Sequence, residues 1–374
     1  MTSLLAWRNL LTDPLRFAAT VIGIVFAVVL ISLQTGMLIG FMRSSAGLVE
    51  NSGANVWVAA RGTTNVDQSG ILGESAYYRA VGIPGVEKLS RTIIQFTGWK
   101  KPDGGTETVI LVGFDPTTGM GAPWSIVEGS IESLSSPNAV MIDRLYADKL
   151  GITQIGQRIE IADRIATVVG FTSGIRTFTQ SPYVFTSYQN ALQYTNIRDG
   201  SSSYLLIGTA PGYAPGTVAR SLASSLSNMD VMTTEDFAAK TQNYWIVTTG
   251  AGSALVMGAV LGALVGMVIV AQTLYSATVE RLSEYATLSA IGAGRGYLNA
   301  IVIKQAVIAG GIGFAVASVI ALAMAWSSTQ SPAAIFLPIH ILALIGLLTI
   351  GMCTAASLLA IRKLHSIDPT SVFR

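Results

Sequence analysis

Residues that could carry out enzymatic chemistry are few in this sequence of 374 residues. It has two histidines, His340 and His365, and neither has the spacing of a zinc site. The single cysteine, Cys353, lies inside an apolar run and is expected to pack there as a small apolar side chain. No Gly-x-x-x-x-Gly-Lys-Ser/Thr motif occurs, so the sequence has no phosphate-binding P-loop. We therefore expect no catalytic residues, no metal site and no bound cofactor.

The composition is that of a membrane protein rather than of a soluble domain. Apolar residues make up 51% of the chain and charged residues only 12%, against about 25% charged in soluble domains. A helix that crosses a membrane needs about 20 mostly apolar residues. Four segments meet this requirement, and the first is longer than the apolar core of a cleaved signal peptide, so we expect it to stay as an anchor. The predicted spans are residues 17–43, 246–276, 298–327 and 335–361.

Lysine and arginine in the short loops predict the orientation of these spans. The N-terminal segment 1–16 holds Arg8 and Arg16, the loop 277–297 holds Arg281 and Arg295, and the tail 362–374 is also basic. The loop 328–334 carries no charge. Both termini and the loop 277–297 are therefore predicted to be cytoplasmic in a bacterial inner membrane, with residues 44–245 outside the cytoplasm. No basic cluster indicates a nucleic-acid partner.

The long segment 44–245 is predicted to be an α+β domain between the first and second spans. Runs rich in Val, Ile and aromatic residues, bounded by turn residues, predict strands. The predicted strands are 56–60, 108–114, 157–161, 165–171, 183–185 and 204–208, and the predicted helices are 143–150, 187–194, 217–227 and 235–244. Its aromatic residues, such as Trp57, Tyr77, Tyr78, Trp99 and Trp124, are expected to fill the core. No substrate-binding residue can be named.

The cytoplasmic segment 277–297 has the pattern of a short amphipathic helix. Glu280 and Glu284 are four residues apart and share one face with Arg281. The segment also carries Leu288 among other apolar residues. Such a helix is a handle for a cytoplasmic partner or a connector on the membrane surface, and the pattern favours neither.

The second span contains two overlapping Gly-x-x-x-Gly repeats, formed by Gly258, Gly262 and Gly266. Small residues at this spacing let two helices approach closely. The partner helix could belong to the same chain or to a second copy in a homodimer, and both remain open. The spans hold very few ionisable residues, which argues against proton or ion coupling inside the membrane.

Several segments together resemble the MacB/FtsX-type (type VII) permeases of ABC transporters. The pattern Val279-x-Arg281-x-x-Glu284-x-x-x-Leu288-x-Ala290-Ile291-Gly292-Ala293 resembles the family's segment before the third span. The order of spans, with one large domain after the first, is also the family's. Three further segments resemble the family's N-terminal helix, the closing strands of its outer domain and its Arg-rich, Asp-Pro-containing tail, namely residues 6–24, 150–172 and 362–374.

The resemblance implies how the subunit is driven. Two copies would assemble with two ABC ATPase subunits, which bind the ATP, and Val279, Glu280, Arg281, Glu284 and Leu288 would contact the ATPase as the coupling helix. The N-terminal helix around Trp7, Arg8 and Leu11 would lie on the membrane surface near the same contact. ATP-driven closure would then move the first two spans and rearrange the outer domains.

The segment ERLSEYATL and the Asp-Pro tail look closest to the DevC and HrtB branch of the family. Two features depart from the family pattern. Tyr285-Ala286 stands where many members have a β-branched or aromatic residue followed by glycine, and no ATPase domain is fused, so a separate chain is expected to supply it.

Three functions remain open at this point. The first is a permease that exports or extracts a hydrophobic or amphiphilic compound, such as a lipid, glycolipid or heme. Its partners would include membrane lipids, a periplasmic adaptor protein and an outer-membrane duct. The second is an FtsX-like mechanotransmission subunit that activates a periplasmic partner without cargo. The third is a membrane-anchored binding module without an ATPase.

Overall fold

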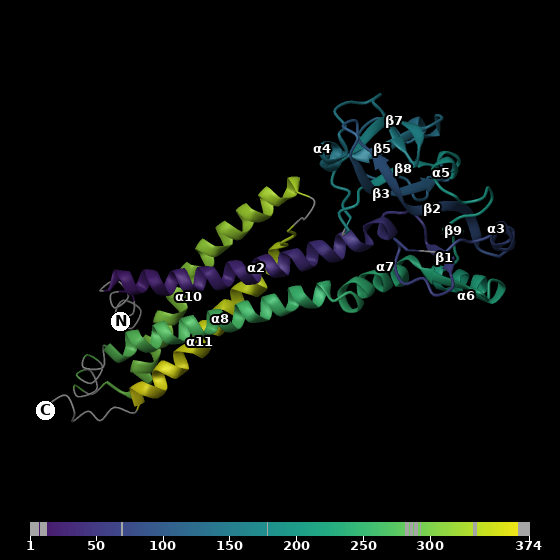
Figure 1. The fold of residues 1–374 in the computed structure, drawn as a ribbon. Coiled ribbons are helices and arrows are strands. Elements are labelled where there is room, and N and C mark those ends of the chain that lie inside the picture. The colour runs from purple at the N-terminus through teal and green to yellow at the C-terminus, as the bar shows by residue number, and fades with distance from the viewer. Residues whose placement is uncertain are drawn as a thin grey trace. The chain divides into compact units, whose positions relative to one another are not determined.

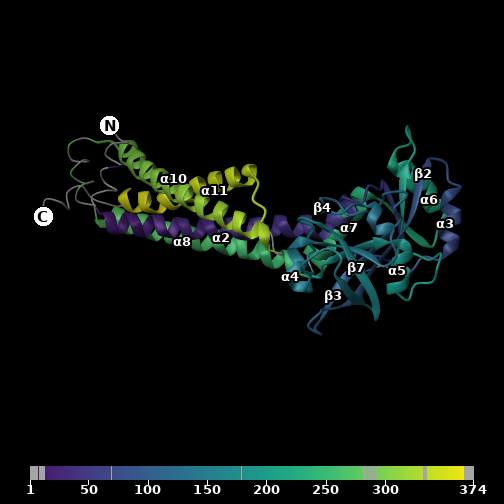
Figure 2. The same ribbon diagram turned by 90° about the horizontal axis from the view of Figure 1, so that it is seen from above.

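The computed structural model describes residues 7, 13–68, 70–177, 179–280, 284, 287, 291, 293–331 and 335–365. The chain forms two compact units. The helical unit comprises residues 1–39, 253–328 and 335–374, and the outer unit comprises residues 40–252 and 329–334. Figures 1 and 2 show the ribbon in two views.

The helical unit is built from four long apolar helices. They are α2 (Pro14–Glu50), α8 (Ala251–Glu280), α10 (Arg295–Ser327) and α11 (Ile339–His365). Each contains a segment long and apolar enough to cross a membrane. At 1.5 Å per residue the 37 residues of α2 span about 55 Å, far more than the roughly 30 Å of a hydrocarbon core. The last part of α2, from Gly40, therefore belongs to the outer unit.

The outer unit is an α+β domain that follows the first long helix and precedes the second. Its strands form one ten-stranded sheet in the order β10-β1-β9-β2-β3-β8-β5-β7-β4, with β6 paired to β2 and β7. The strands are β1 (Val56–Ala60), β2 (Val86–Lys100), β3 (Thr106–Phe114), β4 (Ile126–Glu128), β5 (Ala139–Asp143), β6 (Arg158–Ile161), β7 (Arg164–Thr172), β8 (Tyr183–Ser187), β9 (Tyr204–Thr209) and β10 (Met229–Thr233). Four long apolar helices with this domain between the first two confirm the predicted fold class.

Short helices cover the sheet. They are α3 (Glu74–Val81), η1 (Glu132–Ser135), η2 (Arg144–Tyr146), α4 (Ala147–Leu150), α5 (Tyr188–Tyr194), α6 (Pro215–Ser225) and α7 (Thr234–Asn243), with a π-helical turn, η3 (Tyr244–Thr248), before α8 and a 3₁₀ turn, η4 (Ser328–Gln330), after α10. Figure 1 shows α3 and α6 near strands β1 and β9.

Alternation along β1 places its side chains in two cores, because successive residues of a strand point to opposite faces. Val56 and Val58 pack with α3 and α6. Trp57 and Ala59 pack on the other face, in a core that also contains Leu48 near the end of α2. The 15-residue strand β2 continues from this part of the sheet into the second part. There Trp99 belongs to a third core.

The structure agrees with most of the elements predicted for the outer domain. Strand β1 has the predicted bounds, and the other predicted strands and helices are present with ends shifted by a few residues. Three strands were missed, β2, β5 and β10, together with α3 and the short β4. In β2, the polar residues Glu87 and Lys88 interrupt the apolar pattern, because their side chains are exposed.

Candidate functional site

The glycines of α8 form a close contact with α2 of the same chain. At each of these glycines, a side chain of α2 lies close to the position that a Cβ atom would occupy. A Cβ on Gly258 would lie 2.7 Å from Gln34 Nε2, one on Gly262 would lie 3.0 Å from Leu30 Cδ2, and one on Gly266 would lie 2.2 Å from Ala27 Cβ. The views in Figures 1 and 2 agree that α2 and α8 run side by side. The three glycines thus bring the two helices that flank the outer domain into backbone proximity.

Glycines also bring α10 close to its neighbours. A Cβ on Gly313 would lie 2.5 Å from Ile24 of α2, and one on Gly310 would lie 3.0 Å from the sulfur of Cys353 on α11. The Cys353 side chain is fully buried in the core of the helical unit. Its surroundings are those of a packing residue.

The segment 277–297, which was predicted to be a cytoplasmic coupling helix, is described only in part. Val279 and Glu280 are the last two residues of α8, and the side chains of Glu280 and Glu284 are exposed. Arg281 and Leu288 lie outside the described residues, as do Arg8 and Leu11 near the N-terminus. Trp7 is 42% exposed. In the described part of the segment, the side chains of Glu280 and Glu284 therefore lie at the surface.

The described residues contain no group of three or more histidine, cysteine, aspartate or glutamate side chains placed to hold a metal ion. His340 is exposed at the second position of α11, and His365 is the last residue of that helix. The two histidines are therefore at opposite ends of one helix.

The end of α2 is built into the core of the outer domain. Ala46, Leu48 and Val49 are buried in the same core as Trp57 and Phe237. The indole of Trp57 contacts the ring of Phe237 with centroids 5.2 Å apart. The last turns of the continuous helix α2, which runs from Pro14 to Glu50, are therefore part of this core.

The second connection to the helical unit has a different construction. Gln242 of α7 donates a hydrogen bond from its side-chain nitrogen to the carbonyl of Met42, 3.3 Å away, so α7 is fastened to α2. The chain then passes through the π-helical turn η3 and through Gly250, whose φ is +75°, before α8 begins. π-Helical turns often mark functional positions in helices. This connection is therefore interrupted by a π-helical turn and a left-handed glycine, whereas α2 is one continuous helix.

A buried carboxyl group lies against the core that contains Trp57 and Leu48. Asp67 is 7% exposed and accepts a hydrogen bond from the hydroxyl of Tyr183 at 3.3 Å. Burial raises the pKa of Asp67 from 3.8 to about 6, and the Tyr183 hydrogen bond offsets only part of this effect. Burial, followed by the nearby Asp67, raises the pKa of Tyr183 well above its usual value. Burial therefore disfavours the charged form of Asp67 in the loop after β1.

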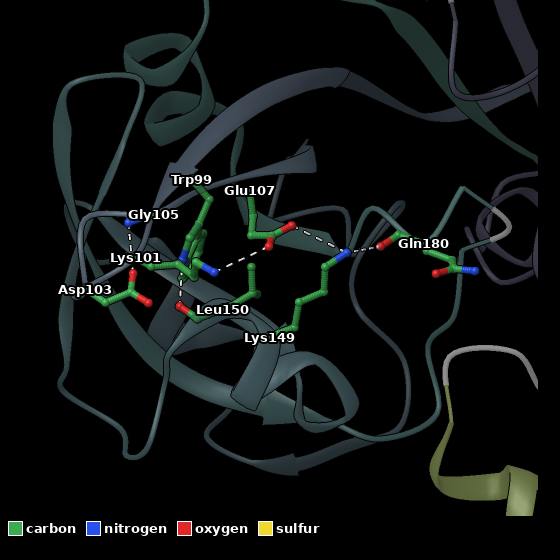
Figure 3. Close-up of polar contacts among 8 residues, drawn as sticks. All are labelled: Trp99, Lys101, Asp103, Gly105, Glu107, Lys149, Leu150 and Gln180. Atoms are coloured by element: carbon green, nitrogen blue, oxygen red, sulfur yellow. Dashed lines mark hydrogen bonds and ion pairs between the residues drawn. The ribbon is translucent and has the colours of Figure 1, made fainter.

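Charged side chains gather at the turn between β2 and β3 (Figure 3). Glu107 lies between two lysines, with Lys101 Nζ at 3.5 Å and Lys149 Nζ at 3.6 Å. Lys149 also donates to the carbonyl of Gln180 at 2.9 Å. At the same turn Trp99 Nε1 donates to the carbonyl of Leu150 at 3.0 Å.

A solvent-open hollow of about 350 Å³ lies beside this turn, lined in part by Lys100, Arg158 and Glu160. Lys100 and Glu160 form an ion pair at 3.0 Å. Because these groups are exposed and partly paired, the hollow has the character of a solvated surface rather than of an enclosed site.

Sequence reasoning did not find Asp67, the joint at Gly250 or the polar contacts of the loop between β7 and β8. An aspartate within an otherwise uncharged loop, TTNVDQSG, is the one signal for Asp67. The run TTGAGS before the second long helix is the signal for the joint, because two glycines there allow a break.

The fold is that of a chain with four long apolar helices and a large outer domain between the first two. Two family models match the chain. The MacB-like periplasmic core domain matches residues 17–225, and the FtsX-like permease C-terminal model matches residues 256–369. The chain belongs to the MacB/FtsX-like family of ABC transporter permeases, and its outer unit is the family's periplasmic domain.

Three solved structures are similar to part of the chain. The periplasmic region of MacB from Actinobacillus actinomycetemcomitans is 12% identical, with a TM-score of 0.38, and the match covers 53% of this chain and 98% of that one. The extracellular domain of the noncanonic ABC-type transporter YknZ from Gram-positive bacteria is 14% identical, with a TM-score of 0.36, and the match covers 48% and 98%. A domain of a putative permease protein from Porphyromonas gingivalis is 15% identical, with a TM-score of 0.33 and coverage of 48% and 86%. No curated protein matches the chain.

Proposed function

We propose that this chain is the permease subunit of an exporter in which a separate ABC ATPase drives export or extraction of a hydrophobic or amphiphilic compound on the periplasmic side. Lipids, glycolipids and heme-like molecules are the cargo class. Two permease copies and two ATPases form the assembly, in a bacterial inner membrane with both termini in the cytoplasm. ATP is hydrolysed by the separate ATPase, and the outer domain of this chain moves in response.

The observation that carries this proposal is the continuity of α2. One unbroken helix of 37 residues begins at Pro14 and ends with Leu48 and Val49 in the core of the periplasmic domain. Helices that lie in register against it, through Gly258, Gly262 and Gly266, must move with it or slide past it. Work delivered at the cytoplasmic end of α2 or α8 therefore reaches the domain without a flexible linker on the α2 side.

The cargo class is supported by the character of the spans. Each candidate span is a long apolar stretch with few charged residues. A polar or ionic cargo needs polar groups along its path, since unpaired charges in a bilayer are costly. An apolar or amphiphilic compound needs none and can leave the membrane at its outer surface.

The coupling contact is proposed at the end of α8. Val279, Glu280, Arg281, Glu284 and Leu288 would enter or flank a groove of the ATPase. The exposed side chains of Glu280 and Glu284 support this, since acidic groups at a surface suit a partner that supplies basic residues. The DevC and HrtB branch, the periplasmic adaptor and the outer-membrane duct belong to the same proposal and are supported by sequence resemblance alone.

The test is copurification with an ABC ATPase, followed by ATP hydrolysis in reconstituted membranes. Glu284→Lys reverses one exposed charge of the proposed contact and should lower ATPase binding and coupled hydrolysis at least tenfold. Glu235→Lys reverses an exposed charge on α7, in the periplasmic domain, and is the matched control. Equal ATPase binding by wild type and Glu284→Lys would exclude the coupling assignment.

Mechanotransmission without cargo, as in FtsX-like proteins, is the second candidate. The same unbroken α2 favours it, because force transfer to the domain requires no path for a compound. Reconstitution separates the two functions. ATP-dependent movement or extraction of a lipid or heme supports export, whereas ATPase stimulation by a periplasmic hydrolase, with no cargo moved, supports transmission.

A further inference from the structure

The loop between β7 and β8 holds the short outer linker that follows α10. The Arg176 guanidinium donates from Nε to the carbonyl of Ser331 at 3.1 Å and from a terminal nitrogen to the carbonyl of Thr329. These residues all belong to the outer unit, although 153 positions separate Arg176 from Thr329 in the sequence. Among the described residues Arg176 forms no salt bridge, so its charge is directed at these carbonyls.

The linker offers the acceptors that an arginine fork requires. The last carbonyls of a helix have no partner within the helix, and a basic side chain near a helix C-terminus can satisfy them. α10 ends at Ser327 and continues as the turn η4. The amide of Ile335 donates to the hydroxyl of Ser328 at 2.9 Å. Arg176 binds the carbonyls of Thr329 and Ser331, which directly follow the end of α10.

The loop that presents Arg176 is itself fixed to the domain. Buried Asp143 accepts hydrogen bonds from the amide of Ile175 at 2.7 Å and from the hydroxyl of Thr172 at 2.8 Å. On the far side of Arg176, Thr177 donates from its hydroxyl to the carbonyl of Ser181 at 2.8 Å. The residues on both sides of Arg176 are therefore held, and its side chain starts from a rigid position.

The linker also determines the geometry of two membrane helices. It joins the end of α10 to the start of α11 and contains only the residues from Ser328 to Pro338. A side chain that fixes two of its carbonyls restricts how far the outer ends of both helices can shift relative to the loop. This gives the periplasmic domain a third attachment, besides α2 and the α7–α8 connection.

We propose that Arg176 is a positioning residue that ties the outer linker between α10 and α11 to the periplasmic domain, so that these two helices respond when the domain moves. The contact is independent of the cargo. Its role in coupling rests on the proposed function, because it presumes that an ATPase drives the domain.

The test is hydrogen–deuterium exchange of the full chain in lipid nanodiscs, followed in peptides that cover residues 325–341. Arg176→Ala should speed exchange in these peptides about tenfold, which corresponds to about 1.4 kcal/mol. Arg176→Lys should give an intermediate rate, because a lysine supplies one point charge in place of a fork. Arg158→Ala removes an exposed arginine of the same domain and is the matched control.

Wild-type exchange rates in Arg176→Ala would overturn the proposal. If Arg176→Ala instead speeds exchange throughout β5, β7 and β8, the domain has lost its fold, and Arg176→Lys then decides. An intermediate rate confined to the linker supports the tie, and a wild-type rate overturns it.

A second arm reads the coupling. In the complex with its ATPase, added nucleotide should change linker exchange in wild type but not in Arg176→Ala. An equal nucleotide response in both would overturn the coupling role. If no ATPase binds the wild-type chain, the proposed function fails, while the nucleotide-free comparison still tests the Arg176 contact.

Discussion

The α-carbon of Gly266 on α8 faces the methyl group of Ala27 on α2 so closely that a Cβ on the glycine would lie 2.2 Å from the Ala27 Cβ. Carbon atoms of this kind do not approach within 3.0 Å. Both residues have small side chains, so the approach of the two helices at this level is limited by their backbones.

Gly266→Ala should therefore push α8 away from α2. Overpacking of this kind costs about 1–3 kcal/mol, and the midpoint of thermal unfolding in detergent should fall. The double variant Gly266→Ala with Ala27→Gly should recover most of the loss, because it only moves the methyl group across the contact. Gly311→Ala, where a Cβ would meet nothing within 4 Å, is the control. A Gly266→Ala variant as stable as Gly311→Ala would contradict the contact.

The buried Asp67 predicts a pH-dependent stability of the periplasmic domain. Its pKa is about 6 in the folded chain, against 3.8 for an unburied carboxyl group. The neutral form is therefore favoured by folding, and stability is greatest below about pH 4 and falls as the pH rises through 6.

Asp67→Asn should remove this dependence and stabilise the full chain at pH 7.5 by roughly 2–3 kcal/mol. The measurement is urea unfolding followed by tryptophan fluorescence at pH 4.5 and 7.5. Asp148→Asn, at an exposed carboxyl group, is the control. Equal pH dependence in wild type and Asp67→Asn would refute the assignment.

The joint before α8 should be sensitive to side chains. Gly250 has a left-handed φ of +75°, and a Cβ on Gly252 would lie 2.7 Å from the Cα of Ile246. Gly250→Ala should cost about 1–2 kcal/mol and raise hydrogen exchange between residues 244 and 252. Gly216→Ala, where φ is not left-handed and a Cβ meets nothing within 4 Å, should leave stability unchanged or raise it slightly. Unchanged exchange in Gly250→Ala would rule out the strain.

Asp143 should be the most important polar residue for the loop between β7 and β8. It is 2% exposed and accepts hydrogen bonds from two backbone amides, those of Leu145 and Ile175, and from the hydroxyl of Thr172. Asp143→Ala leaves these donors without a partner and should cost about 2–4 kcal/mol of unfolding free energy. Thermal unfolding of the full chain measures this. Asp148→Ala is the control, and an equal midpoint for both variants would disprove the role.

The architecture could be predicted because it depends on composition and local pattern. Four apolar segments of sufficient length fix the number of long helices, and β-branched runs such as those of β1 and β9 fix most strands. Strands β2 and β10 escaped because their burial is partial, so their residues do not alternate cleanly.

The contacts of the candidate site could not be predicted in the same way. Gly258, Gly262 and Gly266 predicted a close helix contact, but the sequence does not say whether the partner helix belongs to the same chain or to a second copy. In the structure these glycines face α2 of the same chain. Arg176 gives no signal at all, because its acceptors are backbone carbonyls more than 150 residues away. A backbone carbonyl carries no side-chain identity that a sequence could reveal.

The two chain connections on either side of the periplasmic domain differ in stiffness. On one side α2 enters the core without a break, and on the other α8 begins after a π-helical turn and a left-handed glycine. A continuous helix keeps its direction because backbone hydrogen bonds close every turn. A glycine with a left-handed φ instead gives the chain a point at which its direction can change. The chain therefore enters the periplasmic domain through a stiff segment and leaves it through a segment that can bend.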